Sequence, residues 1–377
     1  MRAAGNGVGW QGLAVNVPSR VRTNDWWGEA WHEARAERNK RDVAGMLDHA
    51  KKHDVDPEVV VAGLPFREDA FRGAIERRIF PDDVAPSEAE AEAGRMAMLD
   101  AGIDVEGIDG LMTQSAVPDF PMPRNTGLVA HRLGLRPDVF AADVDTGCNS
   151  FLTMLTTASA LVHAGQVRRV LTVASSLGMR GIDPMSPAST AVGEAVAAGV
   201  VGEVEEGHGF VAYHAVWHGE WHGALRQTCT TDHPWYRGDL HQQHMFAHVV
   251  DPVGTHEAGA RAATHCRSVV LPLFEKAGVT ADDIDFFAMS TPMAWFPQAM
   301  GEAIGIDPSR RLTHEDHFQR YGHPFGASVS LNLQIAWQQG RLKKGDLVLL
   351  YSPGVGFSFQ AMLYRWNLDR PPTTPIA

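Results

Sequence analysis

The sequence has few cysteines. Only three occur among 377 residues, Cys148, Cys229 and Cys266, and no two of them form a Cys-x-x-Cys pair. An odd number of cysteines without this spacing suits neither a disulfide framework nor a structural zinc site. We therefore expect a protein of a reducing compartment, the cytoplasm, and no bound metal.

Long apolar runs and an excess of basic residues are also missing. No stretch approaches the roughly 18 apolar residues of a membrane-spanning helix, and the N-terminus lacks the pattern of a secretory signal. The net charge is −12, with 45 acidic against 33 basic residues, which disfavours nucleic acid or an anionic membrane as a partner. The length and the 44% hydrophobic content indicate two globular domains or one duplicated unit.

An internal repeat is the most informative feature of the chain. Residues 101–115 (AGIDVEGIDGLMTQS) resemble residues 277–291 (AGVTADDIDFFAMST), and residues 147–176 resemble residues 322–353. Each copy reads as a helix end with a Gly stop, a strand, a long helix, a basic turn and an apolar strand. Two such series predict an α/β fold made of two related halves.

The repeat places Cys148 and His323 at equivalent positions. Each follows a Gly and begins the long helix of its half, so a pseudo-two-fold axis would bring the two helix starts together. The positive end of a helix favours a thiolate, and an imidazole is able to accept the thiol proton. Both helices are apolar almost all round, which predicts that they are buried and that the thiol lies at the bottom of a tunnel.

The segments around these residues resemble those of ketoacyl-ACP synthase III and its acyltransferase relatives in the thiolase superfamily. The resemblance runs almost end to end and is carried by DVDTGCNSF (143–151), SAVPDFPMPRNTGL (115–128), STAVGEAVAAGV (189–200) and the GHPFGAS and PGVGFSF strings near the C-terminus. It implies a five-layered α/β/α/β/α thiolase fold and usually a homodimer. It also implies substrates that are acyl thioesters of coenzyme A or acyl carrier protein, with no metal or redox cofactor.

The resemblance suggests three segments. Residues 1–205 form an N-terminal half with Cys148, residues 206–256 an irregular lid or tunnel insertion, and residues 257–377 a C-terminal half with His323. The family has its substrate entrance in this insertion, so we expect Trp217 and Trp221 to line the tunnel or lid. Phe120 and Met122 fall where the resemblance puts a dimer partner's contribution to the acyl pocket, and packing in the core of their own chain is the alternative.

The insertion also holds two histidines four residues apart, His218 and His222, which is a spacing that metal sites use. In the zinc-protease motif the Glu directly follows the first His, whereas Gly219 stands there in this chain. We therefore disfavour a metal site and expect Cys229 and Cys266 to be structural.

The expected catalytic residues depart from those of the family. The family uses a Cys, a His in an H-Q-A-N string and an Asn in a Y-G-N string. Here Ser290 or Thr291 falls at the His slot, and His323 occupies the Asn slot in a string similar to the GHPxGxSG of thiolases. The resemblance assigns the oxyanion hole to the N–H groups of Cys148 and Gly356, and Asp316 is a candidate to orient His323.

With one imidazole, the simplest reaction passes an acyl group from Cys148 to a hydroxyl or amine that His323 deprotonates. We therefore expect an acyltransferase of specialised metabolism, of polyketide or fatty-acid type. A carbon acceptor stays open, with a decarboxylative β-ketoacyl synthase or a β-keto acid processing enzyme as alternatives. A non-catalytic partner subunit of a condensing enzyme is an alternative of another class, although the presence of Cys148 argues against it.

Overall fold

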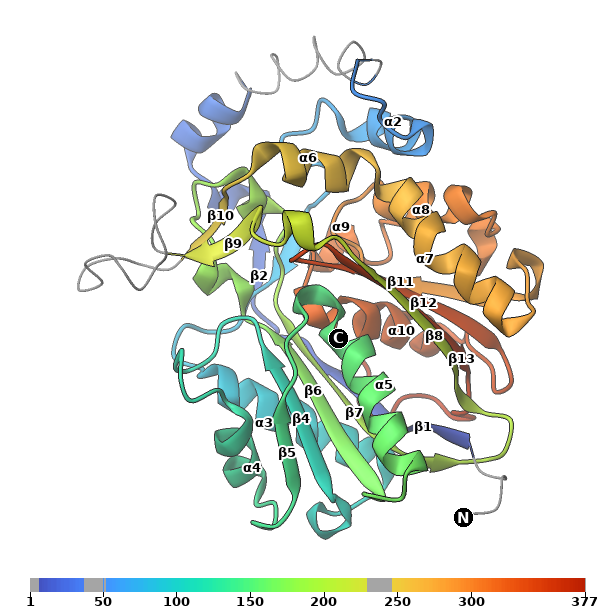
Figure 1. Ribbon diagram of the computed structural model, residues 1–377. Coiled ribbons are helices and arrows are strands. Elements are labelled where there is room, and N and C mark those ends of the chain that lie inside the picture. The colour runs from blue at the N-terminus through green and yellow to red at the C-terminus, as the bar shows by residue number, and fades with distance from the viewer. Residues whose placement is uncertain (1–6, 37–49, 51, 229–245, 377) are drawn as a thin grey trace.

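The computed structural model describes residues 7–36, 50, 52–228 and 246–376. The chain builds two main sheets, one above the other in Figure 1. The strands of the first sheet are, in order, β1 (Gly7–Asn16), β7 (Ala195–Val204), β6 (Arg169–Ser176), β4 (Gly110–Ser115) and β5 (Phe140–Asp143). The strands of the second are β11 (Phe286–Met289), β12 (Leu347–Gly354), β13 (Ser358–Arg365) and β8 (Gly209–Trp217).

The two sheets repeat one pairing pattern. In the first sheet β4 is parallel to β6, β6 is antiparallel to β7, and β7 is antiparallel to β1. In the second sheet β11 is parallel to β12, β12 is antiparallel to β13, and β13 is antiparallel to β8. A parallel bridge from Phe287 to Arg311 stands where β5 stands beside β4. The duplication that the repeat predicted is therefore confirmed.

Three helical layers alternate with these sheets. α5 (Ser150–His163) and α10 (Ser328–Gln338) lie between them and share one core with both. α3 (Pro86–Ala101) and α4 (Thr126–Leu133) pack on the outer face of the first sheet, and α7 (Ala262–Ala277) and α8 (Phe296–Ile304) on that of the second. α3 and α7 end at equivalent glycines, Gly102 and Gly278, both in the left-handed conformation that favours Gly. The result is the predicted five-layered thiolase fold.

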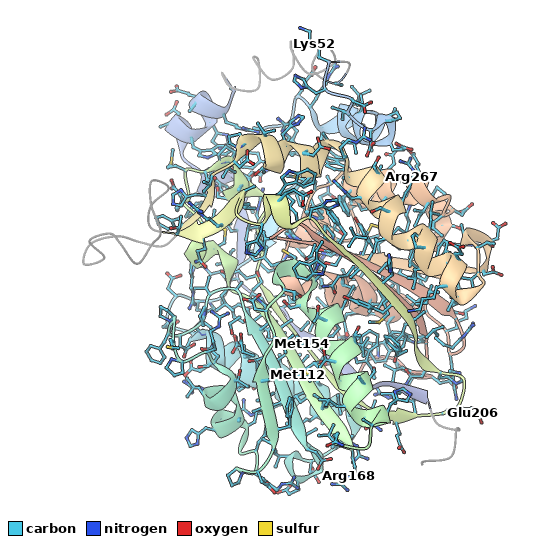
Figure 2. The ribbon with its side chains drawn as sticks, in the orientation of Figure 1. Lys52, Met112, Met154, Arg168, Glu206 and Arg267 are labelled. Atoms are coloured by element: carbon cyan, nitrogen blue, oxygen red, sulfur yellow. The ribbon has the colours of Figure 1, made fainter. Side chains whose placement is uncertain are left out.

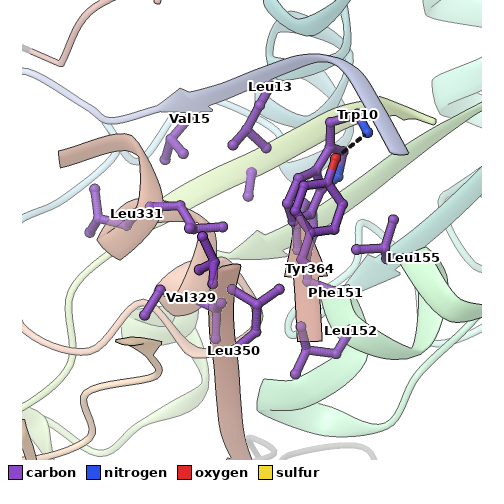
Figure 3. Close-up of a cluster of buried hydrophobic side chains, with 14 of the residues drawn as sticks. Trp10, Leu13, Val15, Phe151, Leu152, Leu155, Val329, Leu331, Leu350 and Tyr364 are labelled. Carbon is purple, nitrogen blue, oxygen red and sulfur yellow. Dashed lines mark hydrogen bonds between the residues drawn. The ribbon is translucent and has the colours of Figure 1, made fainter. Parts of the chain in front are cut away.

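The central layer holds α5 rigidly. Trp10 of β1 stacks on Phe151 of α5 with ring centroids 5.8 Å apart, and the backbone N–H of Trp10 donates to Tyr364 Oη at 2.7 Å, as Figure 3 shows. Met112 of β4 and Met154 of α5 belong to the same core and lie close together in Figure 2. Each large apolar side chain buried in this way contributes about 1.5–3 kcal/mol, so the start of α5 has a fixed place.

The predicted boundaries of the insertion are wrong in their first part. β8 falls within residues 206–256, yet it is a strand of the second sheet, because it pairs antiparallel with β13. The rest of the segment contains η7 (Gly219–Trp221), β9 (Leu225–Thr228), β10 (Phe246–Val249) and α6 (Pro252–Ala260), and β9 pairs with β10. Cys229 and the histidines at 233, 241 and 244 lie outside the described residues.

A second insertion lies between β2 (Val21–Thr23) and β3 (Glu76–Arg78), which pair with each other, and it contains α2 (Pro57–Gly63). α2 is held against α7, because Glu58 pairs with Arg267 and the buried Asp56 accepts from the Thr264 N–H at 2.7 Å. The remaining short helices are η1 (Asn24–Trp26), η2 (Leu64–Phe66), η3 (Val105–Gly107), η4 (Gly147–Asn149), η5 (Gly178–Gly181), η6 (Pro187–Thr190), η10 (Ala281–Asp283), η11 (Pro308–Arg310), α9 (Phe318–Tyr321) and η12 (Phe325–Ala327). Across the described ranges, we find no helix with the length and apolar character needed to cross a membrane.

Candidate active site

Cys148 lies in η4, one turn before α5, and is buried. The preceding Gly147 has a φ of +70°, and a Cβ at this position would come within 2.6 Å of the Val355 side chain, so only Gly fits. The Cys148 carbonyl accepts from Ser352 Oγ at 3.1 Å, and Asn149 donates to Ser358 Oγ at 2.8 Å. Strands of the second half therefore hold the candidate nucleophile of the first.

His323 lies just before η12 and α10 and is also buried. Its N–H donates to the Ala191 carbonyl at 2.7 Å, and its own carbonyl accepts from the Gly193 N–H at 3.3 Å. η12 packs against η4. The structure thus brings the two helix starts together, as the repeat predicted, and it bonds the His323 backbone to the first half.

Burial controls the charge of both groups. Desolvation raises the pKa of the Cys148 thiol to about 12, although a hydrogen bond from the Val355 N–H opposes the shift. Desolvation also lowers the pKa of His323 to about 3. A rise of three pKa units is worth about 4 kcal/mol, whereas a helix end contributes about 0.3–1 kcal/mol. The resting pair is therefore a neutral thiol and a neutral imidazole, not the thiolate that the helix start alone suggested.

The turn between β12 and β13 supplies one backbone donor to the thiol. This donor is the N–H of Val355. The next residue, Gly356, has a φ of +82° and lies beside His222. A Cβ added to Gly356 would be 3.0 Å from His222 Nδ1. Val355 is therefore a candidate partner of the Cys148 N–H in an oxyanion hole, and the role of Gly356 there stays a prediction.

We predict that Val355→Pro slows acylation of Cys148 by an acyl thioester about 10²–10³-fold, because proline removes this N–H, and loss of one oxyanion donor typically has that effect. Val355→Ala keeps the N–H and serves as the control. Single-turnover rates, followed by mass spectrometry, measure the effect. Equal rates for the two variants would exclude this backbone donor.

A second imidazole, His317, was missed by the sequence analysis. His317 is fully buried, and its Nδ1 lies 3.2 Å from Asn332 Nδ2 and 3.4 Å from Thr291 Oγ1. Burial, and then the charge of His323, lowers its pKa to about 3, so the two imidazoles are near each other. The only signal in the sequence is the crowding of three histidines in THEDHFQRYGH (313–323).

The other predicted neighbours have different outcomes. Ser290 is fully buried at the end of β11, and its N–H donates to the Tyr351 carbonyl at 2.9 Å. Ser290 or Thr291 falls at the position of the histidine that the family has in its H-Q-A-N string. Because Thr291 contacts His317, it does not replace that histidine by itself. The Asp316 carboxylate accepts from the N–H and the Oγ1 of Thr313 at 2.9 and 3.1 Å. Asp316 therefore closes the turn before α9, and the prediction that it orients His323 is wrong.

Part of the predicted lid lies against the oxyanion turn. His218 donates its N–H to the Phe357 carbonyl at 2.9 Å and stacks on Trp221 with ring centroids 4.9 Å apart. His265 of α7 completes this cluster, and burial lowers its pKa to about 4. Trp217 is half exposed at the end of β8. In the part of the chain that the structure describes, no three His, Cys, Asp or Glu side chains are grouped to hold a metal ion.

Phe120 and Met122 are 56% and 87% exposed and so do not line a pocket within one chain. Two open hollows lie elsewhere on the surface. One of about 440 Å³ is lined by Asp109, Phe140 and Arg168 near the end of α5 that is remote from Cys148. The other, of about 500 Å³, lies along α3 and α4. Neither reaches the candidate catalytic pair.

Comparisons with known proteins agree with this fold. Residues 142–219 match the family profile described as 3-oxoacyl-[acyl-carrier-protein (ACP)] synthase III, and residues 274–366 match the profile of its C-terminal part. The chain is 28% identical over 297 residues to the β-ketoacyl-[acyl-carrier-protein] synthase III 1 of Halalkalibacterium halodurans, with 78% of this chain and 88% of that protein covered. It is also 28% identical over 303 residues to the synthase III of Mesorhizobium japonicum, with the same coverage.

Solved structures give the same result. The synthase III (FabH) of Thermus thermophilus has a TM-score of 0.73 and 27% identity, covering 95% of this chain and 99% of that chain. An OleA structure from Xanthomonas campestris with bound lauric acid and lauroyl-CoA has a TM-score of 0.71 and 20% identity over 95% of this chain and 99% of that chain. Fold and relatives together define a condensing or acyl-transferring enzyme of the thiolase superfamily. The chain is a ketoacyl-ACP synthase III-like protein.

Proposed function

We propose that this enzyme forms an acyl-Cys148 thioester from an acyl-CoA or acyl-ACP and passes the acyl group to an oxygen, nitrogen or carbon nucleophile in specialised metabolism. The observation that carries the proposal is the packing of η4 against η12, which puts a buried thiol and a buried imidazole at two helix starts. The OleA neighbour with bound lauroyl-CoA supports coenzyme A as one carrier.

The first step follows from the neutral resting pair. His323 takes the Cys148 proton as the sulfur attacks the carbonyl carbon of the donor, and the N–H groups of Cys148 and Val355 hold the oxyanion. The C–S bond to the carrier then breaks, and the imidazolium returns the proton to the departing thiolate. The products are acyl-Cys148, a free carrier thiol and neutral His323, so this half-reaction requires no other reactant.

A homodimer is part of the proposal. β5 is the edge strand of the first sheet, and its residues are mostly exposed in the single chain, as an edge that pairs with a second copy would be. Phe120 and Met122 are exposed as well, and we propose that they complete the acyl pocket of the partner. A non-catalytic subunit stays the alternative of another class, and Cys148 in its packed η4 setting weighs against it.

The test is direct acylation. The purified chain is incubated with acyl-CoA donors from acetyl to lauroyl and with matching acyl-ACPs, and its peptides are then analysed by mass spectrometry. We expect an acyl mass on the Cys148 peptide, with one chain length preferred. If no donor on either carrier leaves a mass there, the scaffold alternative replaces this proposal.

A further inference from the structure

The inference rests on the proposed acyl-Cys148 chemistry and concerns the second imidazole of the site. His317 is 0% exposed, and its Nε2 has no hydrogen-bond partner among the described residues. A buried polar group without a partner costs about 1–3 kcal/mol, so such groups in a folded protein require a reason. His323 has the same property at its Nδ1. Two adjacent imidazoles therefore each have an unpaired ring nitrogen.

The surroundings of His317 fix which ring nitrogen carries the proton. The Asn332 Nδ2 amide is only a donor, and it lies 3.2 Å from His317 Nδ1, while the Thr291 hydroxyl is 3.4 Å from the same nitrogen. With the Asn332 amide in this orientation Nδ1 is the acceptor, and in a neutral ring the proton is on Nε2. The unpaired nitrogen of His317 is then an N–H donor, which requires an oxygen from a bound molecule.

The packing around the loop keeps this donor in place. Phe318, the next residue, is fully buried and packs with Ala74 and Ala294. The Ile75 N–H donates to the Gln319 carbonyl at 2.9 Å. Thr291 itself is fixed by a hydrogen bond from its N–H to Ser328 Oγ at 3.0 Å. The donor is thus held from three segments before any substrate binds, which is what catalysis by preorganised dipoles requires.

This donor is separate from the oxyanion turn. The acyl oxygen on Cys148 has the Val355 N–H beside the sulfur, whereas His317 sits at the start of α9 and close to His323. A simple alcohol or amine acceptor requires a base, but it has no carbonyl oxygen that would become an enolate oxygen. It would leave the His317 N–H buried and unpaired. A second carbonyl oxygen, on the acceptor, would use this donor.

We propose that His317 is a second catalytic histidine, whose Nε2–H binds the carbonyl oxygen of an enolisable acyl thioester acceptor, with Thr291 and Asn332 as its positioning residues. The acceptor is thereby a carbon nucleophile. The enolate forms when the α-carbon loses either a proton, which His323 accepts, or a carboxylate, which leaves as CO₂. The electron pair of the broken bond moves onto the oxygen that His317 holds.

The second step then balances. The enolate α-carbon attacks the acyl-Cys148 carbonyl, a C–C bond forms, and the C–S bond breaks with its electron pair on the Cys148 sulfur. In the deprotonating route this thiolate takes back the proton that His323 accepted. In the decarboxylating route the proton comes from water. No oxidant, reductant or metal takes part.

The experiment compares both half-reactions in wild type, His317→Leu, His317→Gln and His314→Asn. His314 lies in the same loop and pairs with Glu315, so its variant controls for disturbance of the loop. The first half-reaction is acylation of Cys148 by the preferred donor. The second is tested with malonyl-CoA, through CO₂ release, and with acetyl-CoA in D₂O, through deuterium uptake at the α-carbon.

We expect His317→Leu to acylate at close to the wild-type rate but to lose about 10²–10³-fold in the carbon-acid reaction. His317→Gln, which keeps an N–H donor, should recover part of this loss, and His314→Asn should lose nothing. An equal loss in both half-reactions, or none in the second, would overturn the role of His317. Wild-type enzyme that acylates but activates neither carbon acid would also overturn it, whereas wild-type enzyme that does not acylate would overturn the proposed function itself.

Discussion

Replacing Cys148 with Ala should abolish the acyl adduct. The thiol is the only group at the start of α5 that is able to form a thioester, and its surroundings tolerate a smaller side chain because Ser352 and Ser358 bond the backbone and Asn149 instead. We expect no acyl mass on the variant with any donor in the panel, and an unchanged melting temperature.

Cys266→Ala is the matched control for this variant. Cys266 is a fully buried thiol in α7, and burial raises its pKa as well. Unlike Cys148, it has no described histidine at the position that the repeat makes equivalent to its own. Its variant should acylate like wild type. Adducts that persisted after loss of Cys148 and vanished with Cys266→Ala would mean that the nucleophile has been misassigned.

Replacing His323 with Ala should slow acylation about 10²–10⁴-fold, the usual contribution of a positioned general base. With a pKa of about 3 the imidazole is neutral across the working range, so the wild-type rate of acylation should be flat from about pH 5 to about pH 9. A rapid-quench assay of the acyl-enzyme, with wild type at each pH, measures both effects.

Alkylation of Cys148 by iodoacetamide should depend on pH differently from acylation. Iodoacetamide requires the Cys148 thiolate and does not use His323 as the acyl thioester does. With a thiol pKa of about 12, its rate should rise about tenfold for each pH unit over the same range. Alkylation that was fast and independent of pH would instead indicate a resting ion pair. Acylation by His323→Ala at the wild-type rate would remove His323 from the mechanism.

The sequence predicted the duplicated fold well because the repeat depends on features with local physical causes. Gly102 and Gly278 end equivalent helices, and the strands that follow, β4 and β11, are buried on both faces. β8 was misplaced because the earlier copy of this strand, β1, lies at the N-terminus, outside the blocks that align. Its membership of the second sheet depends on pairing with β13, which no local pattern reveals.

The part of the candidate site that belongs to the repeat was also predicted from the sequence. Cys148 and His323 were found because they occupy equivalent positions in the repeat. His317 lies in a loop without periodicity, and only the folding of that loop against Asn332 and Thr291 makes it part of the site. Asp316 was misread because a carboxylate before a histidine resembles a triad, whereas its spacing from Thr313 is that of a hydrogen-bonded turn.

The His323 backbone has a consequence for engineering. The imidazole is encoded in the second half, yet its main chain is bonded to Ala191 and Gly193 of the first, and a Cβ on Gly193 would lie 1.7 Å from the Tyr321 carbonyl. Chimeras that exchange C-terminal halves between homologues should therefore carry residues 190–193 along with the transplanted half. A crossover point that separates residues 190–193 from the second half would keep every catalytic side chain. The His323 backbone would then be bonded to a segment from another homologue, and that segment would set the direction of the imidazole.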